Sequence, residues 1–232
     1  MLRDRSNTEL SEFLRYLANN HCTENDRLPP LAELSSQLGI SIASLREQLE
    51  VARALGLVEV RPKTGIRWMP YTFRPAVSRS LNYAISVSPT NFEYYSDLRN
   101  HIEAAYWYQA VGLLKPEDHE YMRSLVQSAR EKLKGKPVQI PQYEHRELHL
   151  CIFRRLDNPF VLGILEAYWE VYENVGLNVL TDLNYLELVW QYHEKMVEAI
   201  ISGNFAVGYQ ALVDHMALLL QRPKPLPRQN FE

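Results

Sequence analysis

The amino-acid sequence predicts a mainly α-helical protein with two parts, an N-terminal winged helix-turn-helix and a C-terminal antiparallel bundle of six to seven helices. Three observations lead to this prediction. Three helical patterns joined by short turns come first, two short β-type runs around a turn follow them, and the sequence after residue 90 has helical patterns throughout. A length of 232 residues is enough for two domains.

The first three predicted helices each carry a buried stripe and a start or stop signal. In the first, over residues 8–20, the apolar positions with helical spacing are Leu10, Phe13, Leu14 and Leu17. The second begins at Pro29-Pro30, because proline is tolerated in a first turn, and stops at Gly39. Ser41 or Ser44 can cap the third helix, which we expect to run to residue 55.

The two β-type runs, LVEV and IRW, flank the turn RPKTG and predict a hairpin. Helix, helix, turn, helix and hairpin make a winged helix-turn-helix, which we assign to residues 1–70. Residues 70–90 carry three prolines and four serines with little periodicity, so we expect a linker at 71–90.

The remaining sequence predicts the bundle, over residues 91–222. The expected helices are 91–113, 116–133, 141–156, 159–178, 183–201 and 204–221. Proline or glycine separates most of them, as at Asn158-Pro159 and Gly203-Asn204, and such short connections favour antiparallel neighbours. The tail at 223–232, with three prolines among charged residues, is expected to be flexible.

Composition excludes several classes of protein. The two cysteines, Cys22 and Cys151, form no CxxC pair, so a disulfide framework and a thiolate zinc cluster are poorly supported and we expect reduced, partly buried thiols. No run of about 18 apolar residues exists, and the N-terminus is charged where a signal peptide is apolar. We therefore expect a soluble, cytoplasmic protein.

Charge is distributed unevenly along the chain. The net charge is −3, but residues 40–74 hold six cationic against three acidic residues, a local charge of +3. This gradient fits a DNA-binding part followed by a sensing part.

The candidate DNA contacts lie on the third helix and in the hairpin turn. In a helix-turn-helix the second helix enters the major groove. The candidates are Ser41, Ser44, Arg46, Lys63, Thr64 and Gly65. Among the exposed N-terminal positions of this helix, Arg46 is the one able to donate two hydrogen bonds to guanine or phosphate. The alternative for Arg46 is a solvated charge paired with Glu50 one turn later.

The run LPPLAELSSQLGISIASLREQLEVARALGLVEVRPKTG resembles the winged-helix signature of the GntR family of regulators, over residues 8–68. Leucine-proline, the ELxxxLG run, the LRExL run and GLVE before a glycine turn occur in the family's order. The sequence departs from the pattern at Leu31 and Ala32, where the family has an acidic residue and an arginine, and at Ile42, where it has a second arginine. These departures imply that DNA affinity is weaker, or the operator different, than is usual in the family.

Four histidines of the C-terminal part have spacing that predicts a shared site. His145 and His149 lie four residues apart, so on a helix they share one face. His193 lies ten residues before Gly203 and His215 twelve after it, so a helical hairpin turning there brings them nearly level. Imidazoles from three helices can then meet inside the bundle and bind a metal ion.

Such a site suits zinc, and also nickel, copper or iron, better than magnesium or calcium. Zinc is the metal we expect. Glu144, Glu147 and His101 are candidates for additional ligands or for partners that orient the ligands. The alternative is that each histidine is an ordinary surface or core residue.

The same part of the chain resembles the FCD type of sensing domain in the FadR branch of the GntR family, over residues 93–220. The matching stretches are DLRNHIEAA, HRELHLCIFRRLDNPF, YHEKMVEAIISGN and ALVDHMALL. Metal-binding members use an aspartate and three histidines. His149, His193 and His215 match those histidines, and His145 stands at the aspartate position. This leaves open four imidazole ligands, substitution by Glu144, or weaker coordination.

The resemblance also implies a site for an organic acid. Arg99 and Glu103 match the family's arginine and glutamate on the first helix of the domain, and an arginine can hold a carboxylate by two parallel hydrogen bonds. The alternative is an internal Arg99–Glu103 salt bridge. Tyr168, Trp169 and Tyr172 could wall the effector site, of which we name Tyr168 and Tyr172 as contacts, or could simply be core.

Together the patterns and the resemblance predict a DNA-binding transcription regulator, a repressor and not an enzyme, that senses a small carboxylate through a histidine-bound divalent metal. The resemblance and the symmetry of operators imply that it is a homodimer. One alternative is a metal-dependent hydrolytic enzyme, because three histidines leave positions open on a metal. Another is a metal-free ligand-sensing module in which Arg99 alone holds the ligand.

Overall fold

The computed structural model describes residues 10–20, 26–61, 64–174 and 182–220. It divides into two compact units, Met1–Ser80 and Leu81–Glu232, and each is described by itself. Cys22 and the tail at 223–232 lie outside the described residues.

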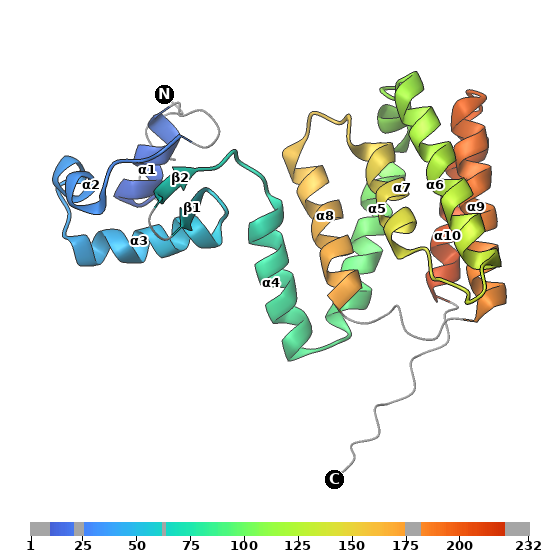
Figure 1. Ribbon diagram of the computed structural model, residues 1–232, viewed down its shortest axis with the longest axis horizontal. Coiled ribbons are helices and arrows are strands. Elements are labelled where there is room, and N and C mark those ends of the chain that lie inside the picture. The colour runs from blue at the N-terminus through green and yellow to red at the C-terminus, as the bar shows by residue number, and fades with distance from the viewer. Residues whose placement is uncertain (1–9, 21–25, 62–63, 175–181, 221–232) are drawn as a thin grey trace, which may run out of the picture. The chain divides into compact units, whose positions relative to one another are not determined.

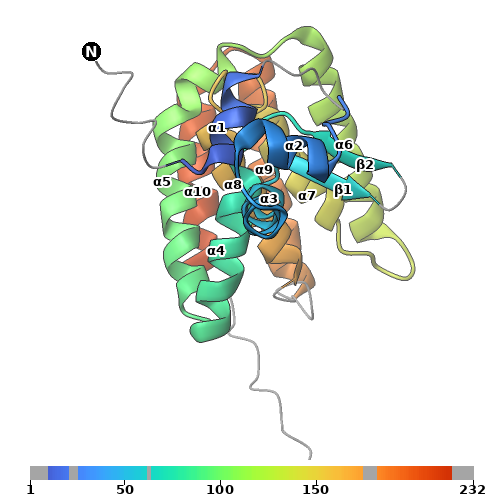
Figure 2. The same cartoon turned by 90° about the vertical axis from the view of Figure 1, so that its left-hand side faces the viewer.

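The N-terminal unit holds the helices and hairpin that the sequence predicts (Figures 1 and 2). Its elements are α1 (Glu12–Asn19), α2 (Leu31–Leu38), α3 (Ile42–Ala54), β1 (Val58–Arg61) and β2 (Gly65–Trp68). Gly39 ends α2 in the left-handed conformation, at φ 68°, which glycine adopts without a steric penalty. Ser41 caps α3, because its side chain accepts a hydrogen bond from Ser44 N at 3.1 Å.

The two strands form an antiparallel hairpin in which Val58 pairs with Trp68 and Arg61 with Gly65. The core of the unit lies between this hairpin and the three helices. Its buried residues are Phe13, Leu17, Leu28, Leu34, Leu45, Leu49, Ala52, Val58 and Ile66. The unit is therefore a winged helix-turn-helix, as predicted.

Residues 71–90, where the sequence favoured a linker of little periodicity, are helical over most of their length. Helix α4 spans Arg74–Val87. Pro75 lies in its first turn, where proline costs no hydrogen bond. Ser78 and Leu81 are buried and Ile85 is half-buried, and their spacing of three and four residues follows one helix face. The serine at the first of these positions concealed the periodicity.

The C-terminal unit is a bundle of antiparallel helices (Figure 1). Its full helices are α5 (Asn91–Val111), α6 (Pro116–Lys134), α7 (Gln142–Phe153), α8 (Pro159–Asn174), α9 (Leu183–Ile201) and α10 (Phe205–Leu220). Each lies within three residues of its expected bounds wherever these fall in the described ranges; residues 175–178 and 221 fall outside them. Gly203 turns the α9–α10 hairpin, at φ 74°.

Large side chains fill the bundle. The most deeply buried apolar ones include Trp107, Met122, Leu148, Ile152, Phe153 and Leu165. A second cluster joins α4, α5 and α8 through Leu81, Phe92, Tyr168, Trp169 and Val171. Cys151 is buried as a free thiol whose pKa is raised to about 11 by burial. Among the described residues, no helix is both long and apolar enough to cross a membrane.

Candidate functional site

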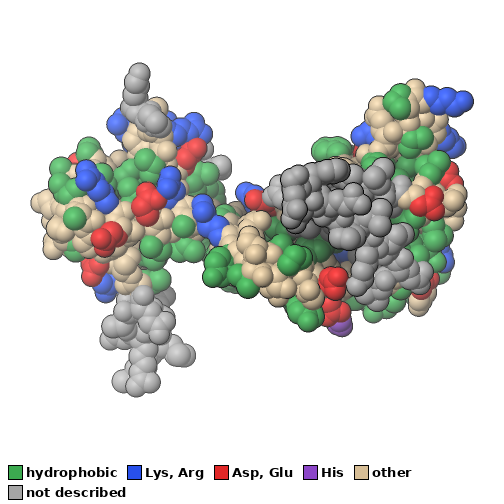
Figure 3. Space-filling view, turned by 90° about the horizontal axis from the view of Figure 1, so that it is seen from below, with side chains coloured by type: hydrophobic (Ala, Val, Ile, Leu, Met, Phe, Trp, Pro, Cys, Tyr) green, Lys and Arg blue, Asp and Glu red, His purple; other side chains and the backbone are tan. Residues whose placement is uncertain are grey.

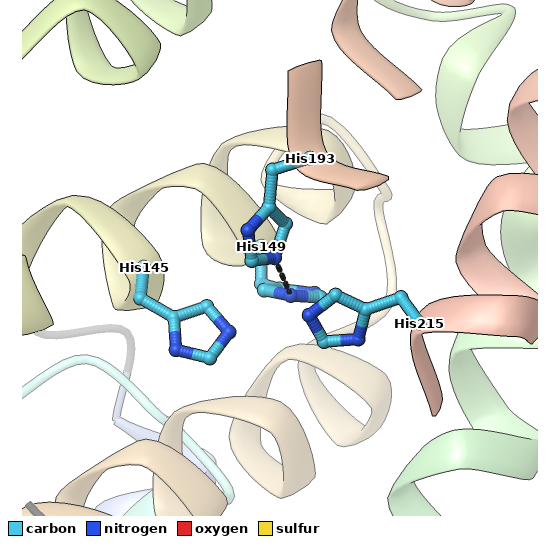
Figure 4. A group of neighbouring side chains, drawn as sticks. All are labelled: His145, His149, His193 and His215. Atoms are coloured by element: carbon cyan, nitrogen blue, oxygen red, sulfur yellow. Dashed lines mark hydrogen bonds between the residues drawn. The ribbon is translucent and has the colours of Figure 1, made fainter. Parts of the chain in front are cut away.

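Four imidazoles meet inside the bundle, from three different helices (Figure 4). His145 and His149 lie one turn apart on α7, His193 comes from α9 and His215 from α10. One ring nitrogen from each lies within 4.8 Å of the others. The His193 and His215 ring centres are 4.3 Å apart, so the α9–α10 hairpin does bring these two side chains level.

Burial keeps three of the four imidazoles uncharged. His149, His193 and His215 are at most 1% exposed. Burial lowers the pKa of all three imidazoles well below 6.5, and the nearby Arg99 guanidinium lowers each further. Neutral imidazole is the form that ligates a metal, so these residues need not release a proton to bind one.

Several buried ring nitrogens have no hydrogen-bond partner among the described residues. His149 Nε2 lies 3.1 Å from His193 Nε2, so one of these two nitrogens carries a proton and donates it. His193 Nδ1 and both nitrogens of His215 have no partner. Leaving a polar atom buried and unpaired costs about 1–3 kcal/mol, a cost that a bound water, ion or ligand removes. The donor set therefore fits a divalent cation that prefers nitrogen ligands.

A buried ion pair adjoins the cluster. Arg99 Nη2 lies 2.8 Å from Glu103 Oε1, one turn away on α5, with both side chains at most 1% exposed. Arg99 Nη2 is also 2.9 Å from His149 Nδ1, and Glu103 Oε2 is 3.3 Å from the same nitrogen. Burial raises the pKa of Glu103, against the opposing effects of Arg99 and His215. The internal salt bridge considered from the sequence thus forms.

His149 Nδ1 therefore faces both a donor and an acceptor. When Nδ1 is unprotonated, it accepts from Arg99 and the Nε2 proton points to His193. When Nδ1 is protonated, it donates to Glu103 and leaves Nε2 free to bind a metal. A carboxylate that accepts the second N–H of a ligating histidine fixes its orientation and tautomer. Glu103 stands in the right place for that role.

Aromatic rings cover the guanidinium of Arg99. Its central carbon lies 4.8 Å from the Tyr168 ring centre and 5.4 Å from that of Trp169. Arg99 Nε and Trp169 Nε1 are buried without a hydrogen-bond partner in the described part of the chain. Tyr172 packs on Trp169 and Phe92, at 5.4 and 6.4 Å between ring centres. These aromatics are core residues that also wall the polar cluster.

Three further candidate ligands lie away from the histidines. Glu144 faces α6, where it pairs with Lys132 at 2.6 Å and accepts from Ser128 at 2.8 Å. Glu147 faces Tyr121, at 3.5 Å. His101 is 76% exposed on α5. The expectation that these residues supply or orient metal ligands is therefore wrong for this arrangement, because their helix positions point elsewhere.

The recognition helix leaves Arg46 on the surface. Arg46 is exposed and has no ion pair among the described residues, whereas Glu50, its possible partner, pairs with Arg53 at 2.5 Å. Ser41 is exposed and Ser44 is half-buried at the start of this helix, where the Ser41 hydroxyl already caps the helix. Figure 2 shows α3 nearly end-on, with the hairpin beside it.

The hairpin turn holds two of the candidate DNA contacts. Thr64 is exposed, and Gly65 has φ 84°, a conformation that favours glycine. Lys63 lies outside the described residues. The sequence did not point to Arg27. Its backbone forms an isolated β-bridge with Arg67 on β2, and a side chain at Gly65 would meet its guanidinium at 3.3 Å. No motif distinguished Arg27, because it precedes the second helix and joins the wing only in the fold. Basic and acidic side chains are interspersed on the face of this unit in Figure 3.

Two family models match the chain. The model "FCD domain" matches residues 95–218, more than half of the chain, and "Bacterial regulatory proteins, gntR family" matches residues 12–67. The structure is similar to that of a Streptococcus agalactiae GntR protein, with 15% identity, a TM-score of 0.59, and coverage of 90% of this chain and 95% of that one. E. coli McbR/YncC gives 18% identity, a TM-score of 0.50, and coverage of 91% and 96%. At these identities the structural likeness shows the fold alone. Comparison with curated proteins gives no significant match.

With the two family models, the winged helix and the helical domain identify a DNA-binding transcription regulator with a ligand-sensing domain, and this family consists of regulators and not of enzymes. The chain belongs to the GntR family of bacterial regulatory proteins and carries an FCD domain. This pairing is consistent with the FadR branch that the sequence predicts.

Proposed function

We propose that this regulator binds a divalent metal through His145, His149, His193 and His215 and uses it to sense a small carboxylate. The observation that carries the proposal is the convergence of four ring nitrogens within 4.8 Å, together with the unpartnered buried nitrogens of His193 and His215. Zinc is the expected ion, because an all-nitrogen donor set suits zinc, nickel, copper or iron.

A bound metal supplies a Lewis acid that attracts a carboxylate oxygen. The residues around it have separate roles. Glu103 orients His149 by accepting its Nδ1 proton, while Arg99 holds the second carboxylate oxygen with donors that the fold has already desolvated. Tyr168 and Tyr172 pack around this position and favour an effector with an apolar part.

The DNA-binding half of the proposal rests on Arg46 and the wing. Arg46 is exposed at the start of the recognition helix, where a guanidinium reaches base edges or phosphates. Ser41, Ser44, Thr64, Gly65 and Lys63 would contact the backbone of the duplex. A homodimer presents two such helices to the two half-sites of an operator. We propose that it acts as a repressor.

Ligand control needs only a small energy difference. A tenfold change in DNA affinity requires about 1.4 kcal/mol of differential effector binding between two arrangements of the protein. A metal-free sensing module remains the second candidate, favoured by the buried Arg99 Nε and Trp169 Nε1 donors, which could hold an anion without a metal.

The test is a mobility-shift assay with the DNA upstream of the protein's own gene, in the presence of candidate organic acids and with or without chelator. We expect Arg46→Ala to abolish the shift. We expect His193→Ala to leave DNA binding intact and to remove the effector response. Equal loss of DNA binding in both variants would contradict the division into a DNA-binding and a sensing part. An effector response that survives chelator and His193→Ala would favour the metal-free module.

A further inference from the structure

The first turn of helix α3 presents apolar side chains to solvent. Ile42 and Ala43 are its first two residues, and both are exposed, Ile42 to 41%. The side of the helix that faces the core carries Leu45, Leu49 and Ala52 instead. Ile42 belongs neither to that core nor to the partly buried residues packed against it in the described part of the chain. Burial in the fold therefore does not account for an isoleucine at this position.

The polar side chains of the same turn are engaged within the unit. Ser41 accepts a hydrogen bond from Ser44 N at 3.1 Å, and Ser44 Oγ accepts one from Gln48 Nε2 at 3.4 Å. Gln48 Nε2 also donates to Glu12 Oε2 on α1, at 2.8 Å. Ser44 and Gln48 thus lie on the flank of α3 that packs toward α1, and helical spacing places Ile42 on the opposite flank.

That opposite flank sets Ile42 beside Arg46. The two residues lie four positions apart, so their side chains are neighbours on the helix surface. In a helix-turn-helix the N-terminal residues of the second helix contact base edges in the major groove. Single exposed apolar residues are common on protein surfaces, but Ile42 lies in the turn that enters the groove. Its side chain is therefore placed to meet a base.

Isoleucine has no hydrogen-bonding group with which to distinguish bases. The apolar group that a base pair presents in the major groove is the C5-methyl of thymine, where cytosine carries a hydrogen. Ala43 has the shortest apolar side chain, so the helix backbone can lie close to the base edges and Ile42 can reach the methyl group. Contact between the two apolar groups removes both from water and favours thymine at that position.

We infer that Ile42 is a specificity-determining residue that contacts a thymine C5-methyl group, next to the base pair or phosphate that Arg46 contacts. The inference rests on the proposed function, because it specifies which base the recognition helix selects. 5-Methylcytosine carries the same methyl group, and unmethylated synthetic DNA leaves thymine as its source.

Uracil substitution isolates the methyl group. Uracil differs from thymine only in lacking the C5-methyl, so it keeps every hydrogen-bonding group of the base pair. The preferred site is first selected from a randomised synthetic duplex library with the full-length protein. Each thymine of that site is then replaced by uracil in turn, and the Kd is measured by fluorescence anisotropy. We expect at least one thymine whose replacement weakens binding about fourfold, the effect of exposing one methyl-sized group.

A double-variant cycle assigns that effect to its side chain. Ile42→Ala shortens the side chain to its Cβ and should bind the thymine and uracil sites equally, with an unchanged Tm because Ile42 is exposed. The matched control is Val51→Ala. Val51 is a 49% exposed residue of the same helix, about 13 Å farther along its axis, so this variant should keep the wild-type sensitivity to uracil. Equal sensitivity in wild type and Ile42→Ala, or none at any thymine, would overturn the inference.

A change of base preference tests the position independently. Ile42→Arg replaces the apolar side chain by a donor that matches guanine O6 and N7. Selection with this variant should enrich guanine where wild type enriches the methyl-sensitive thymine. Retention of thymine there would show that residue 42 does not face that base, and would also overturn the inference.

The outcome is separable from that of the proposed function. If Arg46→Ala abolishes binding to the selected site but no thymine is sensitive to loss of its methyl group, the DNA-binding proposal stands and the role of Ile42 is rejected. If wild-type protein selects no sequence at all, the DNA-binding proposal itself fails, and the role of Ile42 fails with it.

Discussion

Replacing His193 by glutamine should remove one of the four proposed metal ligands while keeping a side chain of similar length. His193 is fully buried, and its ring lies 4.3 Å from that of His215 and 3.1 Å, nitrogen to nitrogen, from His149. Protein zinc sites with four ligands bind with about 10–16 kcal/mol, so one ligand carries roughly 3–4 kcal/mol. We therefore expect zinc affinity to fall about 10²–10³-fold.

Thermal unfolding in the presence of zinc reads out this loss. Zinc at 100 times its Kd stabilises the folded protein by about 2.7 kcal/mol, which raises the Tm of a chain of this size by roughly 5–11 °C. His193→Gln should show almost no shift at the same zinc concentration. His101→Gln is the matched control, because His101 is 76% exposed and outside the cluster. Equal zinc shifts in the two variants would refute the assignment of the ligands.

Three further outcomes follow from the same geometry. In metal-free protein, the pKa of His149, His193 and His215 is lowered by burial, so the unfolded state binds more protons below pH 6.5 and stability falls as the pH decreases. Burial raises the pKa of Glu103, so this carboxyl takes up its proton at a higher pH in the folded state and offsets the effect of one of the three histidines. The free energy of unfolding should then fall by about 3 kcal/mol per pH unit at most. Denaturant titrations at pH 7.5 and 5.5 measure this fall, and equal stability at the two pH values would contradict neutral buried imidazoles. Glu103→Gln should weaken zinc binding about 10–100-fold in a chelator competition, because Nδ1 of His149 loses its anionic acceptor, and unchanged affinity would remove Glu103 from that role. His145→Asp should retain zinc and weaken the response to a carboxylate effector in the mobility-shift assay, whereas a stronger response would reverse the charge argument.

The helix boundaries could be predicted because their signals are local. Gly39 and Gly203 adopt left-handed conformations at helix ends, and Ser41 caps α3 with its own side chain. Helix α4 was not predicted, because its local sequence lacks such signals. Its buried positions include Ser78, and the proline in its first turn resembles the prolines of a linker although it interrupts nothing. The local composition of this segment is that of a linker, whereas its burial in the fold is that of a packed helix.

The histidine cluster could be predicted because helical spacing determines which side chains share a face. Spacing does not determine what the neighbouring residues contact. Glu144 precedes His145, so it points about a quarter-turn away and meets Lys132 on α6 instead of the cluster. Arg99 could be placed near the site by resemblance, but its simultaneous contacts with Glu103 and His149 depend on how α5 packs against α7. Those contacts are non-local and leave no pattern in the sequence.

Charge explains why a site of this composition would respond to an anion. Four neutral imidazoles leave the full charge of a dication uncompensated, whereas an aspartate in place of His145 would cancel one unit. Glu103 is the buried carboxylate next to the cluster in the described part of the chain, and Arg99 balances it at 2.8 Å. The desolvated site would therefore keep an excess positive charge, which is costly in a low-dielectric interior until an anion enters. A carboxylate would satisfy both a bound metal and Arg99 Nε, which has no partner among the described residues, so its binding free energy would be available to favour one arrangement of the protein over another.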